Sequence, residues 1–500
     1  MFRERKRRFT SGVSPSASSV TVADTGAKPT HIATPVVTRT APAIDLQWDA
    51  DVNNPFRRFA FYFALVTMFI RFSVIHEVLA VILNLNLYLL YLVVPPALMG
   101  VAITGGIRRV VRERTGKYWL LFLGWLFLST LFSAWRGGSA GALSLYIKGE
   151  YLMLFVAGGL AMTWREYRQI MYAMFLACLA DLFVGRVFMR QTDDRFNLNM
   201  GGSTIANSND FAVHLILLCG FLLGFALLPK VPAILRLLCW PMLGYATFLI
   251  LGTGSRGALI AVGVFVLFIF LIGSRKQRIT LLVAAPLILA GVISVTPRTT
   301  LMRLATVITQ SEDTSVVEDA EGSSAARREL LKKSLLFTVQ HPVFGVGLGR
   351  FSDFEGGESQ REGKHGMWHE THNSFTQISS ENGIPGLVLF LAALISAFRM
   401  ALTIYRKSGG SAENKDIRIA AFSLMLSMTG FLTAAFFTNF GYRFYEPALC
   451  GLCIVLYHAA EHEMSARQAR SQAPAAPRWA PPQPTANRAP QSTSFSARLR

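Results

Sequence analysis

The sequence predicts an all-α polytopic membrane protein with about twelve transmembrane helices. Hydrophobic residues make up 52% of its 500 residues and charged residues only 16%, a balance typical of a chain whose solvent is lipid. Apolar runs recur between residues 59 and 460, many near the roughly 17 to 25 residues that a helix needs to cross hydrocarbon. The short alternating segments of a membrane β-barrel are absent from the sequence, so the spans are expected to be helical.

The chain is expected to have three parts. Residues 1–55 are rich in Ser, Thr, Pro and Ala, and residues 465–500 in Pro, Gln and Arg, so we expect both to be disordered tails. The first arginines are not followed closely by the apolar core or the cleavage site of a signal peptide, so we do not expect a cleaved signal peptide. Between the tails, residues 56–464 form the expected transmembrane domain, with spans at residues 59–75, 84–104, 118–134, 143–162, 169–189, 209–228, 233–252, 256–273, 279–297, 373–398, 418–440 and 444–460.

The basic residues give the spans an orientation. The net charge is +19, and much of it lies in the tails and in alternate short connections rather than in a patch that would suit nucleic acid. Lys and Arg gather around residues 108–117, 165–168, 230–236, 275–278 and 399–418. Because cytoplasmic loops carry the excess of positive charge, we expect these connections and both tails in the cytoplasm.

One connection, at residues 298–372, is far longer than the others and is expected on the extracytoplasmic side. Loops of this length are usually functional. Residues 325–340 within it have the pattern of an amphipathic helix. Such a helix suits the membrane surface; its expected apolar side consists of Leu331, Leu335, Leu336 and Val339.

The first candidate for chemistry is Arg256, between Ser255 and Gly257 at the expected extracytoplasmic mouth of two spans. An arginine between apolar runs is costly unless it reaches the interface or has a partner. Both an interfacial anchor and a functional site therefore stay open. The neighbouring glycines favour a site, since they let backbone or ligand approach closely.

The second candidate is Arg327, which precedes His341-Pro342 and a glycine run at residues 345–349. The run lacks the strand and crossover of a dinucleotide fingerprint, and by itself it predicts a flexible turn. Two planar guanidinium groups, those of Arg256 and Arg327, suit a diphosphate, which accepts bidentate hydrogen bonds. A solvated helix face is the alternative for Arg327 alone.

The third candidate is a group of histidines, His365, His369 and His372, with Glu370 among them. His369 and His372 are three residues apart rather than the four of a zincin helix, so no metal is expected. A histidine at a membrane mouth suits general-base catalysis, because its ordinary pKa lies near 6.5. A polar interfacial histidine is the alternative.

In this order the motifs resemble those of the bacterial O-antigen ligase and polymerase superfamily. The resemblance extends over residues 59–460, with weaker matches at Lys148 and at residues 205–210. One departure is Leu331, where many members have tryptophan. The motifs that carry the resemblance are Ser255-Arg256-Gly257, Arg327 followed by His341 to Phe351, and His372-Asn373 followed by Gln377, Glu381, Gly383, Gly386 and Leu387.

The resemblance implies a GT-C-like, inverting glycosyltransferase of the bacterial inner membrane that needs neither a metal nor another cofactor. Its donor would be an undecaprenyl-diphosphate-linked glycan, and its acceptor a hydroxyl of a glycan or of lipid A core. By analogy, Arg256 and Arg327 would bind the diphosphate and His372 would deprotonate the acceptor, oriented by Glu370 or Glu381. The implied substrate-binding residues are Arg256, Arg327, Lys148, His341, Asn373 and Glu381.

Four alternatives remain open. A ligase transfers a finished glycan, a polymerase extends a chain, and a protein O-oligosaccharyltransferase glycosylates a side-chain hydroxyl. A transporter would also suit a dozen spans, although it should show charges near the midplane of the membrane. Asp181 is the main such charge, and we expect it to pair with Lys148 or Arg186.

Overall fold

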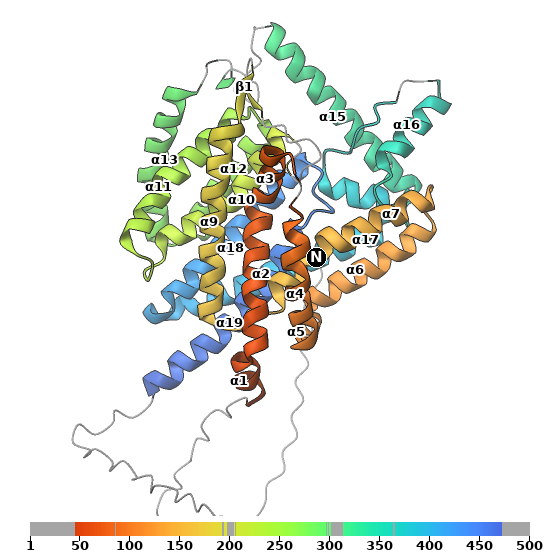
Figure 1. The fold of residues 1–500 in the computed structure, drawn as a ribbon. Coiled ribbons are helices and arrows are strands. Elements are labelled where there is room, and N and C mark those ends of the chain that lie inside the picture. The colour runs from red at the N-terminus through yellow and green to blue at the C-terminus, as the bar shows by residue number, and fades with distance from the viewer. Residues whose placement is uncertain are drawn as a thin grey trace, which may run out of the picture. The chain divides into compact units, whose positions relative to one another are not determined.

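The structure is a computed structural model, and it describes residues 46–85, 87–192, 195–197, 205, 207–296, 298, 300–301, 314–363 and 366–472. The described residues from Gln47 onward belong to one unit by their contacts. The described chain is helical apart from a two-stranded antiparallel hairpin, β1 (Arg190–Thr192) and β2 (Arg195–Asn197) (Figure 1). The expectation of an all-α chain is confirmed.

The helices follow the order of the expected spans. The first half consists of α1 (Leu46–Asn53), α2 (Pro55–Ser73), α3 (Ile75–Leu83), α4 (Leu89–Ile103), α5 (Gly106–Arg112), α6 (Arg114–Leu131), α7 (Arg136–Tyr146), the π-helical turn η1 (Ile147–Tyr151), α8 (Met153–Gly158), α9 (Trp164–Phe188) and α10 (Ser208–Leu227). The second half consists of α11 (Ala233–Gly252), α12 (Arg256–Ile272), α13 (Arg275–Val295), α15 (Thr314–Gln340), α16 (Phe351–Arg361), α17 (Ser374–Lys407), the short helices η2 (Ser408–Gly410) and η3 (Ala412–Asn414), α18 (Lys415–Ala434), η4 (Ala435–Phe437) and α19 (Tyr445–Gln472).

Each expected span overlaps one or more of these helices, but fewer than twelve helices meet a test of span length and composition. By length and composition, seven helical stretches of the described chain can cross a membrane, or up to nine if each bent pair counts as one span. The bent pairs are α2 with α3, at 67°, and α4 with α5, at 72°. Apolar α12, at 17 residues, falls just short of the length required of a span. The multi-pass architecture is therefore confirmed, while the count of twelve is not.

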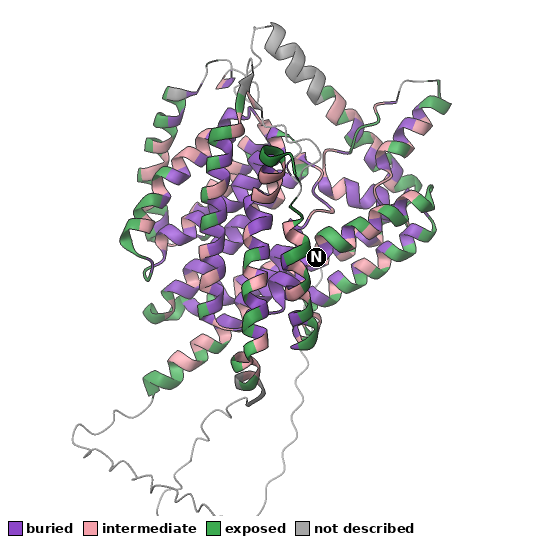
Figure 2. Cartoon of the chain, viewed as in Figure 1, coloured by how far each residue is buried: buried purple, intermediate pink, exposed green. Residues whose placement is uncertain are grey.

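The core of the bundle forms around α10, which packs against α9, α11 and α18. Small residues permit this close approach: a Cβ on Gly220 would lie 2.2 Å from Oγ of Ser427. The hydroxyl of Ser423 donates to the carbonyl of Gly220 at 2.8 Å, a contact typical of helices that pack in lipid. Figure 2 shows that α10 and α18 are mostly buried, whereas α13 is largely exposed.

The expected partner of Asp181 is wrong. Its Oδ2 lies 3.0 Å from Nε2 of His214 on the neighbouring helix α10, and both side chains are fully buried. Nδ1 of His214 lies 2.9 Å from the hydroxyl of Tyr445. Lys148 is exposed, so it does not share this environment. The pair follows from the packing of α9 on α10, which hydropathy alone does not reveal.

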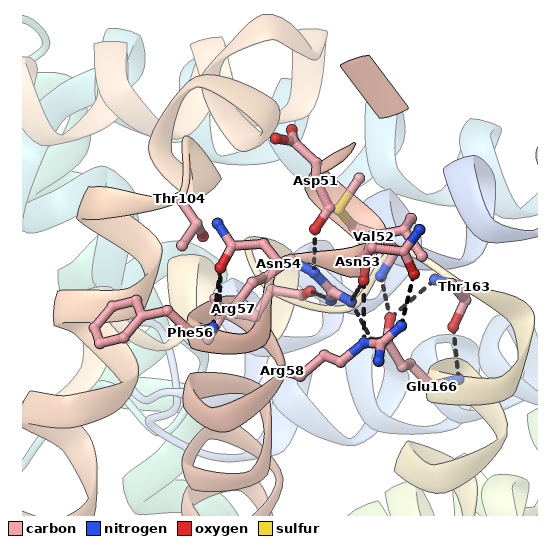
Figure 3. Close-up of polar contacts among 12 residues, drawn as sticks. Asp51, Val52, Asn53, Asn54, Phe56, Arg57, Arg58, Thr104, Thr163 and Glu166 are labelled. Atoms are coloured by element: carbon pink, nitrogen blue, oxygen red, sulfur yellow. Dashed lines mark hydrogen bonds and ion pairs between the residues drawn. The ribbon is translucent and has the colours of Figure 1, made fainter. Parts of the chain in front are cut away.

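Part of each expected tail is helical. Helix α1 begins at Leu46, and α19 continues to Gln472. The fully buried Arg57 fixes the end of α1, because its guanidinium donates to the carbonyls of Asp51 and Val52, both at 2.9 Å, and to Glu166 at 2.7 Å (Figure 3). The remaining residues of both tails, 1–45 and 473–500, lie outside the described part.

Candidate functional site

The glycine run after α15 is an ordered loop packed on α17, and not the flexible turn that its composition predicts. The N–H groups of Val346 and Gly347 donate to the carbonyls of Ser380 and Glu381, at 2.9 and 3.0 Å. The carboxylate of the fully buried Glu381 accepts the N–H groups of Gly349 and Phe351, at 2.8 and 3.2 Å. Glu381 therefore holds this loop in place.

Glycine is required in this loop for steric reasons. Gly347 has φ 115°, and a Cβ there would lie 1.9 Å from Oγ of Ser133. Gly345 has φ 69°, and its Cβ would lie 2.3 Å from the carbonyl carbon of Glu381. L-residues rarely adopt positive φ. The spacing of the glycines is therefore that of a loop laid against a helix.

Beside this loop lies an open polar pocket of about 680 Å³, which we call the polar pocket. Its walls come from α7 and η1, from the start of α10, from α15, from residues 368–372 and from residues 437–443. The lining residues with polar side chains include Glu150, Asn207, Asn209, Asp210, Arg327, His369, Glu370, His372, Gln377, Asn439, Tyr442 and Arg443. Several of these segments are hundreds of residues apart in sequence, so the pocket is a product of the fold.

His372 lines the polar pocket in a strained conformation. Its φ is 52°, in a region that non-glycine residues enter at a cost and that is frequent at functional sites. It immediately precedes Asn373, which caps α17 by accepting the N–H groups of Phe375 and Thr376, at 3.0 and 3.1 Å. Burial and the positive charges of Arg327 and His369 lower the pKa of His372 from 6.5 to about 4. The imidazole is thus neutral near pH 7 and can accept a proton.

Arg327 and Arg443 supply positive charge to the same pocket. Arg327 comes from α15 and Arg443 from the loop before α19. Sequence reasoning missed Arg443 as a site residue, although its short loop falls on the same expected side as Arg256. Asp210 and Asn207 also line the pocket, at the start of α10; only the weak motif at residues 205–210 pointed to them.

Arg256 lies beside the polar pocket rather than among its lining residues. It is the first residue of α12 and is half-buried. The next residue, Gly257, packs so closely on Phe437 that a Cβ would lie 2.5 Å from the Cβ of Phe437. Phe437 itself lines the pocket, so the start of α12 forms the layer behind that wall.

The other candidate residues take different positions. Lys148 is exposed in η1 and does not line the pocket, although Glu150 of the same turn does. His341 is exposed outside the pocket, with its ring 5.4 Å from that of Phe354. The oxygen of Asn373 is used in capping α17, and the carboxylate of Glu381 in holding the glycine loop. Of the two carboxylates expected near His372, Glu370 is the one that lines the pocket.

The expected amphipathic helix of the long loop is part of α15, which buries one side on the protein and exposes another. Leu330, Ser334 and Phe337 are buried toward the protein. The apolar side expected from the sequence points away from it, with Leu331, Leu335, Leu336 and Val339 exposed. This is the arrangement that the expected membrane-surface helix requires. Residues 302–313 of the loop lie outside the described part.

No three His, Cys, Asp or Glu side chains are grouped to hold a metal ion within the described chain. His365, the first histidine of the expected group, lies outside the described part. All five cysteines are free and buried. Cys450 and Cys453 thus behave as small apolar residues.

The fold and the pocket define a multi-pass membrane protein with a polar pocket at one end of its helices, lined by both basic and acidic side chains. Residues 241–391 match the family described as O-Antigen ligase. This range includes Arg256, Arg327 and His372, and it confirms the resemblance of the motifs. The family is one of glycosyltransferase-type enzymes, so the match supports membrane glycan ligase or polymerase activity.

Two further comparisons add little. No curated protein matches the sequence. A chain from a structure titled "Structural coordination of polymerization and crosslinking by a peptidoglycan synthase complex" is similar over 69% of this chain and 96% of that chain, with 15% identity and a TM-score of 0.35.

Proposed function

We propose that this protein transfers a glycan from undecaprenyl diphosphate to an acceptor hydroxyl at the extracytoplasmic face of the bacterial inner membrane. The observation that carries the proposal is that Arg327 and His372, from two separate motifs, line one polar pocket. The match of residues 241–391 to the O-Antigen ligase family supports it. Both termini would then lie in the cytoplasm, as the charge distribution favours.

In the proposed step, neutral His372 takes the proton of the acceptor hydroxyl as the oxygen attacks the anomeric carbon. The bond from that carbon to the diphosphate breaks, and undecaprenyl diphosphate leaves. A single displacement inverts the anomeric configuration. Negative charge develops on the diphosphate, and fixed cations stabilise it in the transition state.

Three arginines lie in or beside the pocket where this charge would develop. Arg327 and Arg443 line the pocket, and Arg256 lies behind its wall at the start of α12. A bound diphosphate would also offset the positive field that lowers the pKa of His372. Donor binding would therefore raise the basicity of His372 when the acceptor arrives.

The direct test is glycan transfer in proteoliposomes with a lipid-diphosphate-linked donor. His372→Ala should lower the rate by at least about 100-fold, the usual loss for a general base. His458→Ala is the matched control, since His458 pairs with Glu113 at 3.1 Å and does not line the pocket. Full activity in His372→Ala would remove the base from the proposal, and activity lost with a chelator and restored by a divalent ion would contradict metal independence.

The acceptor is decided by a different experiment. In a null strain, single repeats on carrier lipid would identify a polymerase, whereas accumulated long chains on carrier lipid would identify a ligase. Unchanged surface glycan together with an unglycosylated protein would identify a protein O-oligosaccharyltransferase. The size and openness of the pocket suit a saccharide acceptor, so we favour a ligase or polymerase.

A further inference from the structure

A second pocket lies at the opposite end of the same helices. The polar pocket includes Asn209 and Gln377, near the starts of α10 and α17. The second one, which we call the basic pocket, includes Leu227 and Tyr405, near the ends of α10 and α17. It has a volume of about 660 Å³. The proposed glycan transfer uses no residue of this pocket.

The basic pocket carries positive charge without a carboxylate. Four cationic side chains line it, those of Arg275, Lys276, Lys415 and Arg418, and no Asp or Glu is among its described lining residues. The nearby Asp416 is engaged elsewhere, because it pairs with Arg467 at 2.8 Å. The pocket therefore suits an anion.

Arg418 is held in place by Tyr405 and by the carbonyl of Gly409, which accepts a hydrogen bond from its Nη1 at 3.4 Å. It lies 4.6 Å above the ring of Tyr405, and its Nη2 donates to the hydroxyl of Tyr405 at 3.3 Å. Its Nε is buried and has no hydrogen-bond partner within the described chain. A buried donor of this kind is costly unless a ligand or water satisfies it.

An apolar chamber of about 240 Å³ adjoins the basic pocket, and the two share Leu227 and Gln277. Its walls come from α10, α11, α12 and α13. An apolar cavity of about 150 Å³ can stay dry and take up a hydrocarbon-like ligand. From Gln277 to Ile288, both of which line the chamber, α13 rises by about 17 Å at about 1.5 Å per residue. That depth is close to half of the roughly 30 Å hydrocarbon core.

We propose that the basic pocket and the apolar chamber together bind one anionic glycerophospholipid. Its phosphate contacts Arg275, Lys415 and Arg418, and one acyl chain enters the chamber. A free phosphate is a less suitable occupant, because it would leave the chamber unused. The terminal tails of this chain are also less suitable, because they are rich in arginine and the cations of the pocket would repel them. Basic pockets between membrane helices are suited to anionic headgroups. The lipid would also cover α13, because only 11% of its apolar stretch is buried within the protein.

The test is native mass spectrometry of the full-length protein titrated with phosphatidylglycerol or phosphatidylcholine. We expect one phosphatidylglycerol to bind in preference to phosphatidylcholine. The triple variant Arg275→Gln/Lys276→Gln/Lys415→Gln should weaken its binding at least about tenfold, since each surface cation contributes to anionic-lipid attraction. The matched control removes three exposed cations outside the basic pocket, as Arg108→Gln/Arg114→Gln/Lys117→Gln.

A second variant tests the chamber. Ala285→Trp fills it from α13 and should also weaken phosphatidylglycerol binding at least about tenfold, by excluding the chain. Equal binding of phosphatidylglycerol by the triple variant and the control would overturn the proposal. Equal binding of phosphatidylcholine, or displacement by soluble glycerol phosphate at the same concentration, would overturn the assignment to an anionic lipid.

Discussion

The backbone N–H of Gly349 donates to Oε2 of Glu381 across 2.8 Å. The two residues belong to different motifs, one in the glycine loop and one inside α17. Their contact joins the loop after α15 to the helix that begins beside His372. We infer that the glycine loop, residues 345–351, contributes support rather than a reacting group.

Glu381→Gln tests this support. An amide presents only one acceptor oxygen where the carboxylate accepts the N–H groups of Gly349 and Phe351. One buried N–H then loses its partner, so we expect a loss of about 1–3 kcal/mol in stability. Hydrogen exchange of residues 345–351 should be faster. Glu358→Gln, on α16, is the control, and equal exchange in both variants would contradict the role of Glu381.

Gly347→Ala tests the steric requirement of the loop. The new Cβ would lie 1.9 Å from Oγ of Ser133, at a residue with φ 115°. Strain of this kind costs about 1–3 kcal/mol before the clash is counted, so the melting temperature should fall clearly. Gly357→Ala is the matched control in α16, because its Cβ would meet no atom within 4 Å. That variant should be neutral or up to about 1 kcal/mol more stable.

Arg327→Gln tests the electrostatic coupling in the polar pocket. Burial lowers the pKa of His372 to about 4, and the positive charge of Arg327, with a smaller effect from His369, adds to the shift. Removing that charge should raise the pKa of His372 toward 6.5, and NMR titration of labelled histidine measures it. As the pH is lowered, any residual transfer activity should then begin to fall at a higher pH than in the wild type, because His372 is protonated there. The exposed neighbour Arg328 supplies the control as Arg328→Gln, and an unchanged pKa in Arg327→Gln would refute the coupling.

Arg443→Gln tests the site residue that the motifs did not indicate. If Arg443 binds the donor diphosphate, the variant loses a charge-assisted hydrogen bond of about 1.5–3 kcal/mol. The KM for the donor should rise at least about tenfold. Arg136→Gln serves for comparison, since Arg136 is exposed and outside the pocket. The same KM in both variants would exclude Arg443 from donor binding.

The sequence predicted those features that depend on local pattern. Apolar runs located the helices, because lipid requires each span to satisfy its own backbone. Motif order identified Arg327 and His372, which share a pocket. The pairing of Asp181 with His214 depends instead on how α9 meets α10. Membership of a motif also says nothing about where a side chain points: His341 is exposed outside the pocket, and Arg443 lines it without a motif.

The N-terminal boundary of the membrane domain can be tested by truncation. Removing residues 1–45 leaves α1 intact and should change neither stability nor transfer activity. Removing residues 1–53 takes away the carbonyls of Asp51 and Val52, which accept hydrogen bonds from Arg57 at 2.9 Å. Arg57 is fully buried, and each unsatisfied buried donor costs about 1–3 kcal/mol, so the melting temperature should drop by several degrees. Equal melting temperatures for the two truncations would show that Glu166 and the carbonyl of Leu160, which also accept hydrogen bonds from Arg57, are enough to satisfy it, and that the domain begins at α2 rather than α1.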